Sequence, residues 1–199
     1  MKIINLTDSP IKQRLEFTED ENILLVSKSS GDADLEIILN AEGITVNVFG
    51  IVFLQKNEHL KLKTKSIHAV PNTFSRVHLK GVFADSSKMD YEGLIKIDKN
   101  AQLSDAYLQN DNLLIGDNAV VNSSPQLEIC ADDVKASHGV TISSFEDEYV
   151  YYLMSRGLDE STSRQMLVHG FLNDIIKKID IDHTLELVQL IPALKNEEL

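Results

Sequence analysis

The chain has 199 residues, is 43% hydrophobic and carries a formal net charge of −12. A chain of this size can bury a core of its own, and its acidity argues against nucleic-acid binding because phosphates would be repelled. No segment approaches the roughly 20 apolar residues of a membrane helix, and the first residues lack the features of a signal peptide, so we expect a cytoplasmic protein that does not bind membranes.

Short segments of alternating apolar and polar residues fill the chain up to about residue 143. Alternation of this kind predicts half-buried β-strands, and it is clearest at residues 35–39, 44–49, 60–62, 94–97 and 127–130. Asparagine and aspartate between the segments predict tight turns, as at Asn72 and in the run 110–112. The lysines at 61, 63 and 65 are expected on the solvated face of one strand.

The β-rich part shows no strong helical pattern between about residues 23 and 143. This argues against a doubly wound α/β fold, which needs helices between its strands. The spacing of about ten residues between strand segments is typical of a sandwich or barrel, but solenoid repeats can be degenerate. Sandwich, barrel and β-solenoid therefore remain open on periodicity alone.

The last part of the chain reads as helical. The segment 144–147, Ser-Phe-Glu-Asp, resembles a capping box that opens a helix, and Gly157 fits the position that ends it. Asp159 is expected to cap a second helix, whose apolar residues form one broad stripe. A third helix is expected from Asp182 to Pro192. We therefore predict a β domain over residues 1–143 and a helical domain over residues 144–199.

The stripe of the second helix is wide for so small a unit. Phe171 and Ile175 lie on it, and we expect part of the stripe to pack on the β domain and part to face a partner.

Enzymatic motifs are absent: the sequence has no phosphate-binding loop, no nucleophile elbow and no HExxH helix. The single cysteine, Cys130, excludes an intrachain disulfide and zinc sites that need two or more cysteines. A lone cysteine is usually a small core residue, with a cluster ligand as the alternative. We predict that the protein is not an enzyme.

Four histidines could be either ordinary structural residues or metal ligands. His59, His68 and His78 are spaced by nine and ten residues, so a solenoid would allow them to stack, while scattered surface positions are the alternative. His138 is followed by Gly139, which permits close backbone approach. It is either an ordinary corner histidine or a metal ligand.

Several motifs in one order resemble the SufB/SufD family. Residues 127–141 read LEICADDVKASHGVT, close to the family signature that precedes a helical tail, and residues 151–158 read YYLMSRGL, close to a segment of that tail. Upstream, GVFAD at 81–85 and NLLIG at 112–116 fall in the family order. The similarity extends from about residue 68 to residue 179, and residues 1–40 match weakly.

The resemblance implies a right-handed parallel β-helix followed by a small C-terminal helical domain. It implies assembly with a SufB-type paralogue, or with itself, through the edges of the β-helix. It also implies docking of a SufC-type ABC ATPase on the C-terminal helices, and we assign Tyr152, Arg156, Phe171 and Ile175 to that surface. No tightly bound cofactor is expected, and a transient iron–sulfur cluster is compatible with the family.

The family resemblance also bears on individual residues. The histidine of its SHG motif is implicated in cluster formation on the SufD side and corresponds to His138, with Cys130 as a second interface candidate. The position where the SufB side supplies a cysteine holds Ala119, so the chain looks SufD-like. One cysteine cannot hold a cluster alone, which leaves a homodimeric cluster carrier and a reused scaffold without cluster chemistry as alternatives.

Overall fold

The computed structural model describes residues 1–7, 10–144 and 146–179, which form eleven β-strands and two α-helices. The strands are β1 (Lys2–Asn5), β2 (Ile11–Phe17), β3 (Glu21–Ser27), β4 (Gly31–Leu39), β5 (Thr45–Leu54), β6 (His59–His68), β7 (Phe74–Phe83), β8 (Lys88–Ile97), β9 (Asp105–Leu114), β10 (Val120–Ile129) and β11 (Lys135–Ser144). The helices are α1 (Asp147–Ser155) and α2 (Glu160–Ile176).

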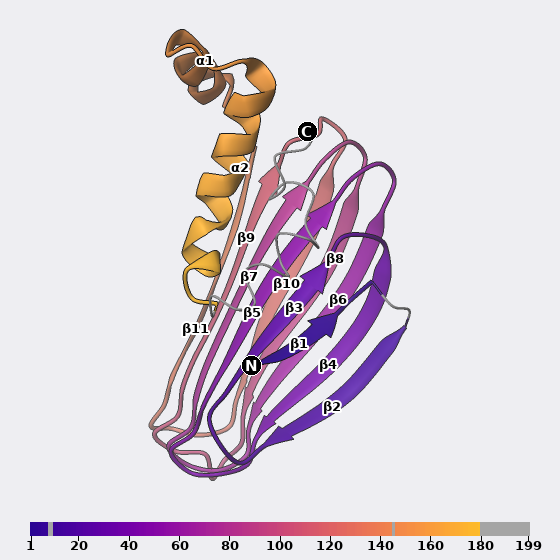
Figure 1. The fold of residues 1–199 in the computed structure, drawn as a ribbon. Coiled ribbons are helices and arrows are strands. Elements are labelled where there is room, and N and C mark those ends of the chain that lie inside the picture. The colour runs from indigo at the N-terminus through magenta and orange to yellow at the C-terminus, as the bar shows by residue number, and fades with distance from the viewer. Residues whose placement is uncertain (8–9, 145, 180–199) are drawn as a thin grey trace.

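Odd-numbered and even-numbered strands form two separate sheets (Figure 1). Sheet A has the order β1-β3-β5-β7-β9-β11, and sheet B has the order β10-β8-β6-β4-β2. Every neighbouring pair is parallel, because the chain crosses from one sheet to the other after each strand. The expectation of a mainly β protein with a parallel β-helix is confirmed, and sandwich and barrel are excluded.

The core lies between the two sheets and follows from the strand period of two. In sheet B, Leu62 aligns with Ala33 on one side and Tyr91 on the other, and all three are at most 1% exposed. In-register parallel pairing stacks inward residues of successive turns in columns. The alternate residues point to solvent, and there Lys63 pairs with Glu92 at 2.8 Å as expected for a solvated face.

The three histidines at 59, 68 and 78 do not stack. His59 faces outward from sheet B and contacts Asp90 at 2.6 Å, and His78 faces outward from sheet A and contacts Asp111 at 3.1 Å. His68 points into the core. The stacked ligand set is therefore excluded.

His68 is held inside the solenoid by hydroxyl groups. Its Nδ1 lies 2.8 Å from Thr73 Oγ1, and its Nε2 lies 2.8 Å from Ser75 Oγ. Burial lowers the pKa of His68 to about 4, because desolvation disfavours the imidazolium. This histidine is a neutral part of the core.

The run Asn110-Asp111-Asn112 lies inside β9, so the turn expected there is wrong. Asn110 and Asn112 are fully buried and face the interior. Asn112 Nδ2 donates to Asn110 Oδ1 at 2.8 Å, and Ser123 Oγ donates to the same oxygen at 2.9 Å. Because these side chains bond one another across the core, the parallel ladder outweighs their preference for turns. Asn72 does lie at a corner, with φ of +57°.

The helical unit follows the sequence signals at the end of α1 and at the start of α2. Asp159 accepts a hydrogen bond from the backbone of Thr162 at 2.9 Å, and Gly157 has φ of +94° after the end of α1. The capping box at Ser144 is wrong, since Ser144 ends β11 and the N-cap of α1 is Glu146, which makes no side-chain cap bond. The helix expected from Asp182 lies outside the described residues.

Helix α2 packs on the outer face of sheet A (Figure 1). Its buried apolar residues contact a second apolar cluster, separate from the core between the sheets. The cluster comprises Leu24, Val26, Phe49, Ile51, Phe53, Val82, Leu113, Val168, Leu172, Ile175 and Ile179. Ile175 is therefore core between helix and sheet, and Phe171 is half-buried against the cluster.

Candidate functional site: the C-terminal end of the solenoid

The solenoid ends in two long edge strands. β10 and β11 have ten residues each, and each pairs with a neighbour on one side, β8 and β9 respectively. Within the described residues, no strand pairs with their outer edges. An edge of this kind presents a row of backbone donors and acceptors that another strand can use.

The inner face of these strands is apolar and uncovered. Leu127 and Ile129 align with Ile95 and Ile97, which are fully buried, yet both are 39% exposed. Val140 and Ile142 of β11 are 37% and 46% exposed. We call this surface the open end, and it consists of Val121, Ser123, Pro125, Leu127, Ile129, Ala136, His138, Val140 and Ile142.

His138 lies on the inner face of β11, within the open end. It aligns with Leu108, which is 1% exposed and belongs to the core, whereas His138 is exposed because no further turn among the described residues covers it. Among the described residues, the side chain of His138 makes no hydrogen bond or ion pair. The imidazole is thus available to a group brought by another molecule.

Gly139 faces the opposite side of β11. A Cβ atom there would lie 2.6 Å from Gln109 Oε1, because the Gln109 side chain crosses over this position. Because this oxygen ends a flexible side chain that can move aside, the contact by itself does not require a glycine here.

Cys130 follows β10 in the corner that leads to β11. It is exposed, so the expectation of a core cysteine is wrong. Its backbone N–H donates to Ile97 O at 2.9 Å, which fixes the corner. In the part of the chain that the structure describes, no three His, Cys, Asp or Glu side chains are close enough to hold a metal ion. Cys130 and His138 do not form a ligand set within one chain.

Sequence reasoning missed the polar layer under the open end. Besides Asn110 and Ser123, it includes Asn112, whose Nδ2 donates to Thr141 O at 3.3 Å and so ties β11 to the interior. The signal was present in the sequence, because Asn110 and Asn112 are separated by two positions and so share a face of a strand.

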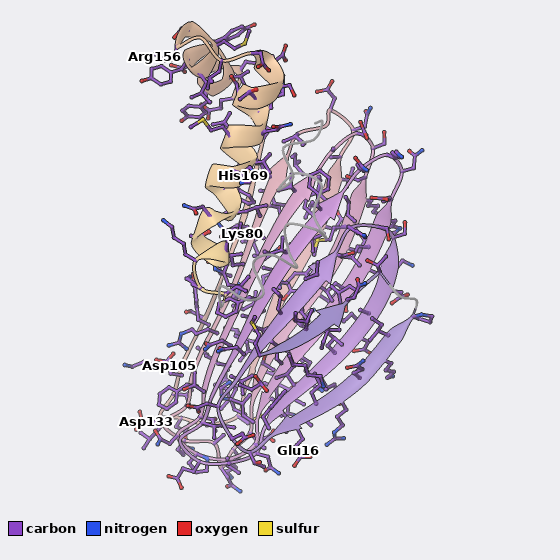
Figure 2. All side chains as sticks on the ribbon, in the orientation of Figure 1. Glu16, Lys80, Asp105, Asp133, Arg156 and His169 are labelled. Atoms are coloured by element: carbon purple, nitrogen blue, oxygen red, sulfur yellow. The ribbon has the colours of Figure 1, made fainter. Side chains whose placement is uncertain are left out.

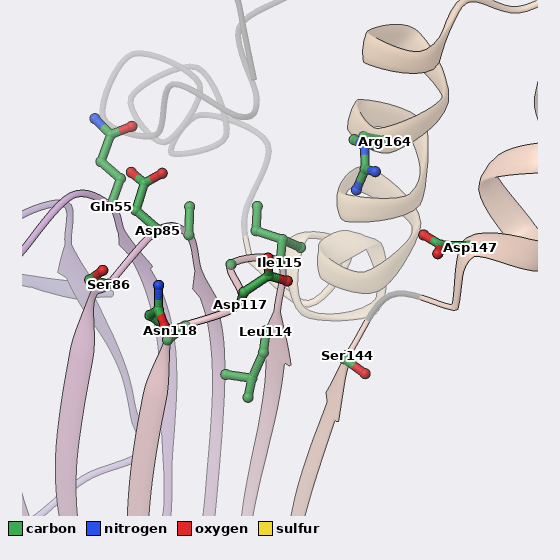
Figure 3. Close-up of a pocket in the computed structure, with 13 residues that line it drawn as sticks. Gln55, Asp85, Ser86, Leu114, Ile115, Asp117, Asn118, Ser144, Asp147 and Arg164 are labelled. Atoms are coloured by element: carbon green, nitrogen blue, oxygen red, sulfur yellow. The ribbon is translucent and has the colours of Figure 1, made fainter.

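A wide depression of about 960 Å³ lies between the corner loops and the helical unit (Figure 3). The loop after β9, including Gly116, Asp117 and Ala119, forms one wall, and Asp147 and Arg164 of the helices lie opposite. No thiol lines it. Ala119 in this wall offers no side-chain ligand for a metal.

The helical unit carries an exposed aromatic surface. Tyr149, Tyr151 and Tyr152 are 55%, 68% and 57% exposed. The guanidinium of Arg156 lies 5.2 Å from the ring centroid of Tyr152, and its Nη2 donates to the Tyr152 hydroxyl at 3.4 Å. Figure 2 shows Arg156 at the tip of the unit, away from the sheets. No helix among the described residues is long and apolar enough to span a membrane.

Comparisons with known proteins identify the family of the chain. Residues 18–171 match the family described as SUF system FeS cluster assembly, SufBD core domain. The chain is 35% identical to iron-sulfur cluster assembly protein SufD of Escherichia coli (strain K12) over 71% of this chain and 33% of that protein. It is 28% identical to iron-sulfur cluster assembly protein SufB of Bacillus subtilis (strain 168), over 77% of this chain and 33% of that protein.

Fold and edge geometry define the class: an all-parallel β-solenoid with one uncovered apolar end and a helical appendage. Within that class, the chain belongs to the SufBD family of the SUF system for iron–sulfur cluster assembly. It spans about a third of the length of the SufD and SufB relatives that it matches. The chain is also 33% identical to a SufBD family protein of Mycobacterium tuberculosis (strain ATCC 25618 / H37Rv). That match covers 72% of this chain and 17% of the relative.

Proposed function

We propose that the protein is a non-catalytic, SufD-like assembly subunit. It pairs through its open end with a SufB-type paralogue or a second copy of itself, and it binds a SufC-type ATPase through its helices. An iron–sulfur cluster is the cargo, assembled transiently at the interface beside His138. Nucleotide chemistry belongs to the ATPase.

The open end is the observation that carries this proposal. Two adjacent ten-residue edge strands with exposed apolar inner faces would favour aggregation unless another chain covers them. A partner strand on β10 or β11 would satisfy the free backbone groups and complete the core at once. His138 would then be enclosed at the centre of the contact.

The SufD-like assignment is supported by which ligands the chain has and lacks. Ala119 stands where the SufB side supplies a cysteine, and one cysteine, Cys130, is present in 199 residues. Iron–sulfur clusters are usually held by about four ligands, mostly thiolates. A partner therefore has to contribute most of the ligands, and this chain contributes His138.

The aromatic surface around Tyr152 and Arg156 is the better candidate for ATPase binding. Interfaces are enriched in tyrosine and arginine, and here both are exposed. Of the four residues assigned to that surface from the sequence, Ile175 of α2 is buried against sheet A and Phe171 is half-buried. The proposed docking surface is thus moved to α1 and the first half of α2.

The test is co-expression with the SufB-type and SufC-type proteins of the same organism, followed by size-exclusion chromatography with light scattering. We expect a stable complex of defined stoichiometry. Ile142→Asp should abolish pairing at the open end, because an aspartate would be buried without a partner. Ser137→Asp, on the outer face of the same strand, should leave pairing intact.

A further variant separates assembly from chemistry. His138→Ala should leave the complex intact while lowering the amount of cluster formed on anaerobic reconstitution, read from the visible absorbance. The proposal would be contradicted if the chain stayed monomeric with every partner and the Ile142→Asp variant behaved like the unmodified protein.

Exposure of both Cys130 and His138 favours one second candidate, a homodimeric cluster carrier. Two copies would supply two thiolates and two imidazoles. Anaerobic reconstitution of the isolated protein should then give visible absorbance that Cys130→Ser removes. Colourless protein after reconstitution would eliminate this candidate and leave the assembly subunit.

A further inference from the structure

Helix α2 has two halves with different surroundings. Its second half lies on sheet A, where Leu172 and Ile175 are fully buried. Its first half extends past the sheet and carries α1, whose single buried residue is Val150 (Figure 1). Since α2 has 17 residues, it is about 25 Å long. Because α2 is one continuous helix, a contact at its free end would also move the half that packs on sheet A.

A buried lysine lies at the centre of the docked half. Lys80 of β7 is 9% exposed and aligns with Ile51 of the apolar cluster (Figure 2). Its Nζ donates to Phe171 O at 2.6 Å and contacts Asp174 Oδ1 at 2.6 Å. The same Nζ lies 4.5 Å from the ring centroid of Phe171. All three partners come from α2.

Among the described residues, Lys80 contacts a counter-charge only in docked α2, because Asp111, which aligns with it on β9, contacts His78 instead. Burial of an ammonium group is unfavourable unless a counter-charge and hydrogen bonds accompany it. Burial raises the pKa of Asp174, but the hydrogen bond and charge of Lys80 outweigh this and leave the pKa below its ordinary value. If α2 leaves the sheet, Lys80 is hydrated instead. Docked and undocked states are therefore both free of an uncompensated charge.

The solenoid does not need α2 for its own core. The core between the sheets contains no residue of either helix, and the cluster under α2 is separate from it. Strand pairing of sheet A is likewise complete without the helix. Loss of the α2 contact would thus leave the solenoid folded.

We propose that Lys80 and Asp174 form a latch, by which α2 docks on sheet A in one register and detaches as a unit from an intact solenoid. This goes beyond the proposed function, because it concerns a movement within this chain and does not require a partner. Intermediate positions of α2 are disfavoured, because a helix shifted by one turn would replace Asp174 opposite Lys80 by Gly170 or Lys178, neither of which carries a negative charge.

Backbone hydrogen exchange, resolved by segment, tests the latch. Asp174→Asn removes the ion-pair partner of Lys80, so exchange of residues 168–176 should rise at least about tenfold while β4 to β8 stay protected. Lys80→Met removes the buried charge and keeps the length of the side chain, so exchange of α2 should stay at or below that of the unmodified protein. A merely stabilising ion pair would be weakened by both changes.

Two further variants complete the test. Lys80→Met with Asp174→Asn should behave like Lys80→Met alone, because no charge remains to be compensated. Glu160→Gln is the matched control, since it removes an exposed ion pair with Arg164 in the undocked half of the same helix, and should change exchange less than about twofold. Unchanged exchange of α2 in Asp174→Asn, faster exchange in Lys80→Met, or a parallel rise in β4 to β8 would each overturn the proposal.

Discussion

The two ends of the solenoid differ in the length and polarity of their edge strands. At the N-terminal end, β1 has four residues and β2 has seven, and β2 exposes Lys12, Gln13, Arg14 and Glu16. At the C-terminal end, both edge strands have ten residues. Short, charged edges resist pairing with other chains, whereas long apolar ones invite it.

Burial of the inward residues differs in the same direction. Ile4 of β1 is 5% exposed, while Ile142 of β11 is 46% exposed, although both are isoleucines on the inner face of an edge strand of sheet A. The same residue type thus serves the fold at one end and is available for assembly at the other. The comparison teaches that strand position, more than side-chain type, decides which role an inward residue has.

The largest expected effect comes from placing a charge at each of these isoleucines. Ile4→Asp should lower the free energy of unfolding by about 4 kcal/mol, because the carboxylate would be buried in the core. Ile142→Asp should change it by less than about 0.5 kcal/mol, since the site is open to solvent in the single chain. Urea titration of both variants measures this, and equal destabilisation would break the distinction between the ends.

Much of the fold was predictable from the strand period. The alternation at residues 44–49 and 60–62 placed side chains inside and outside correctly, because each residue of a half-buried strand reports its own environment. The architecture could not be predicted from the strand period, because sandwich, barrel and solenoid share that period. The order of family motifs was needed to choose the solenoid.

The errors have a common physical cause. Asn110 and Asn112 were assigned to a turn because isolated asparagines favour turns, but here they bond each other and Ser123 inside the core. Ile175 was assigned to a partner surface because a stripe does not say what covers it. In each case the covering group comes from another segment, Ser123 for Asn110 and sheet A for Ile175, and the local pattern does not identify that segment.

A second test contrasts two inward histidines, one in the middle of the solenoid and one at the open end. The folded protein keeps His68 neutral down to its pKa of about 4, whereas the unfolded chain binds a proton from about pH 6.5. Stability should therefore fall by about 3 kcal/mol as the pH drops from 6.5 to 4. His68→Gln, which retains a hydrogen-bonding side chain, should flatten this dependence in urea titrations.

His138 supplies the control for this measurement. It is exposed at the open end, so His138→Gln in the isolated chain should leave the pH dependence unchanged. If His68→Gln retained the full loss of stability between pH 6.5 and 4, the buried neutral histidine would not be its source.

The smallest expected effect concerns neighbouring serines on opposite faces of β10. Ser123 Oγ donates to Asn110 Oδ1 at 2.9 Å under the open end, while Ser124 is exposed on the outer face. Ser123→Ala should lower the free energy of unfolding by about 1 kcal/mol, because a buried acceptor loses a donor. Ser124→Ala should leave it unchanged. Equal effects of the two would mean that the polar layer is hydrated, and that the open end admits water as far as Asn110.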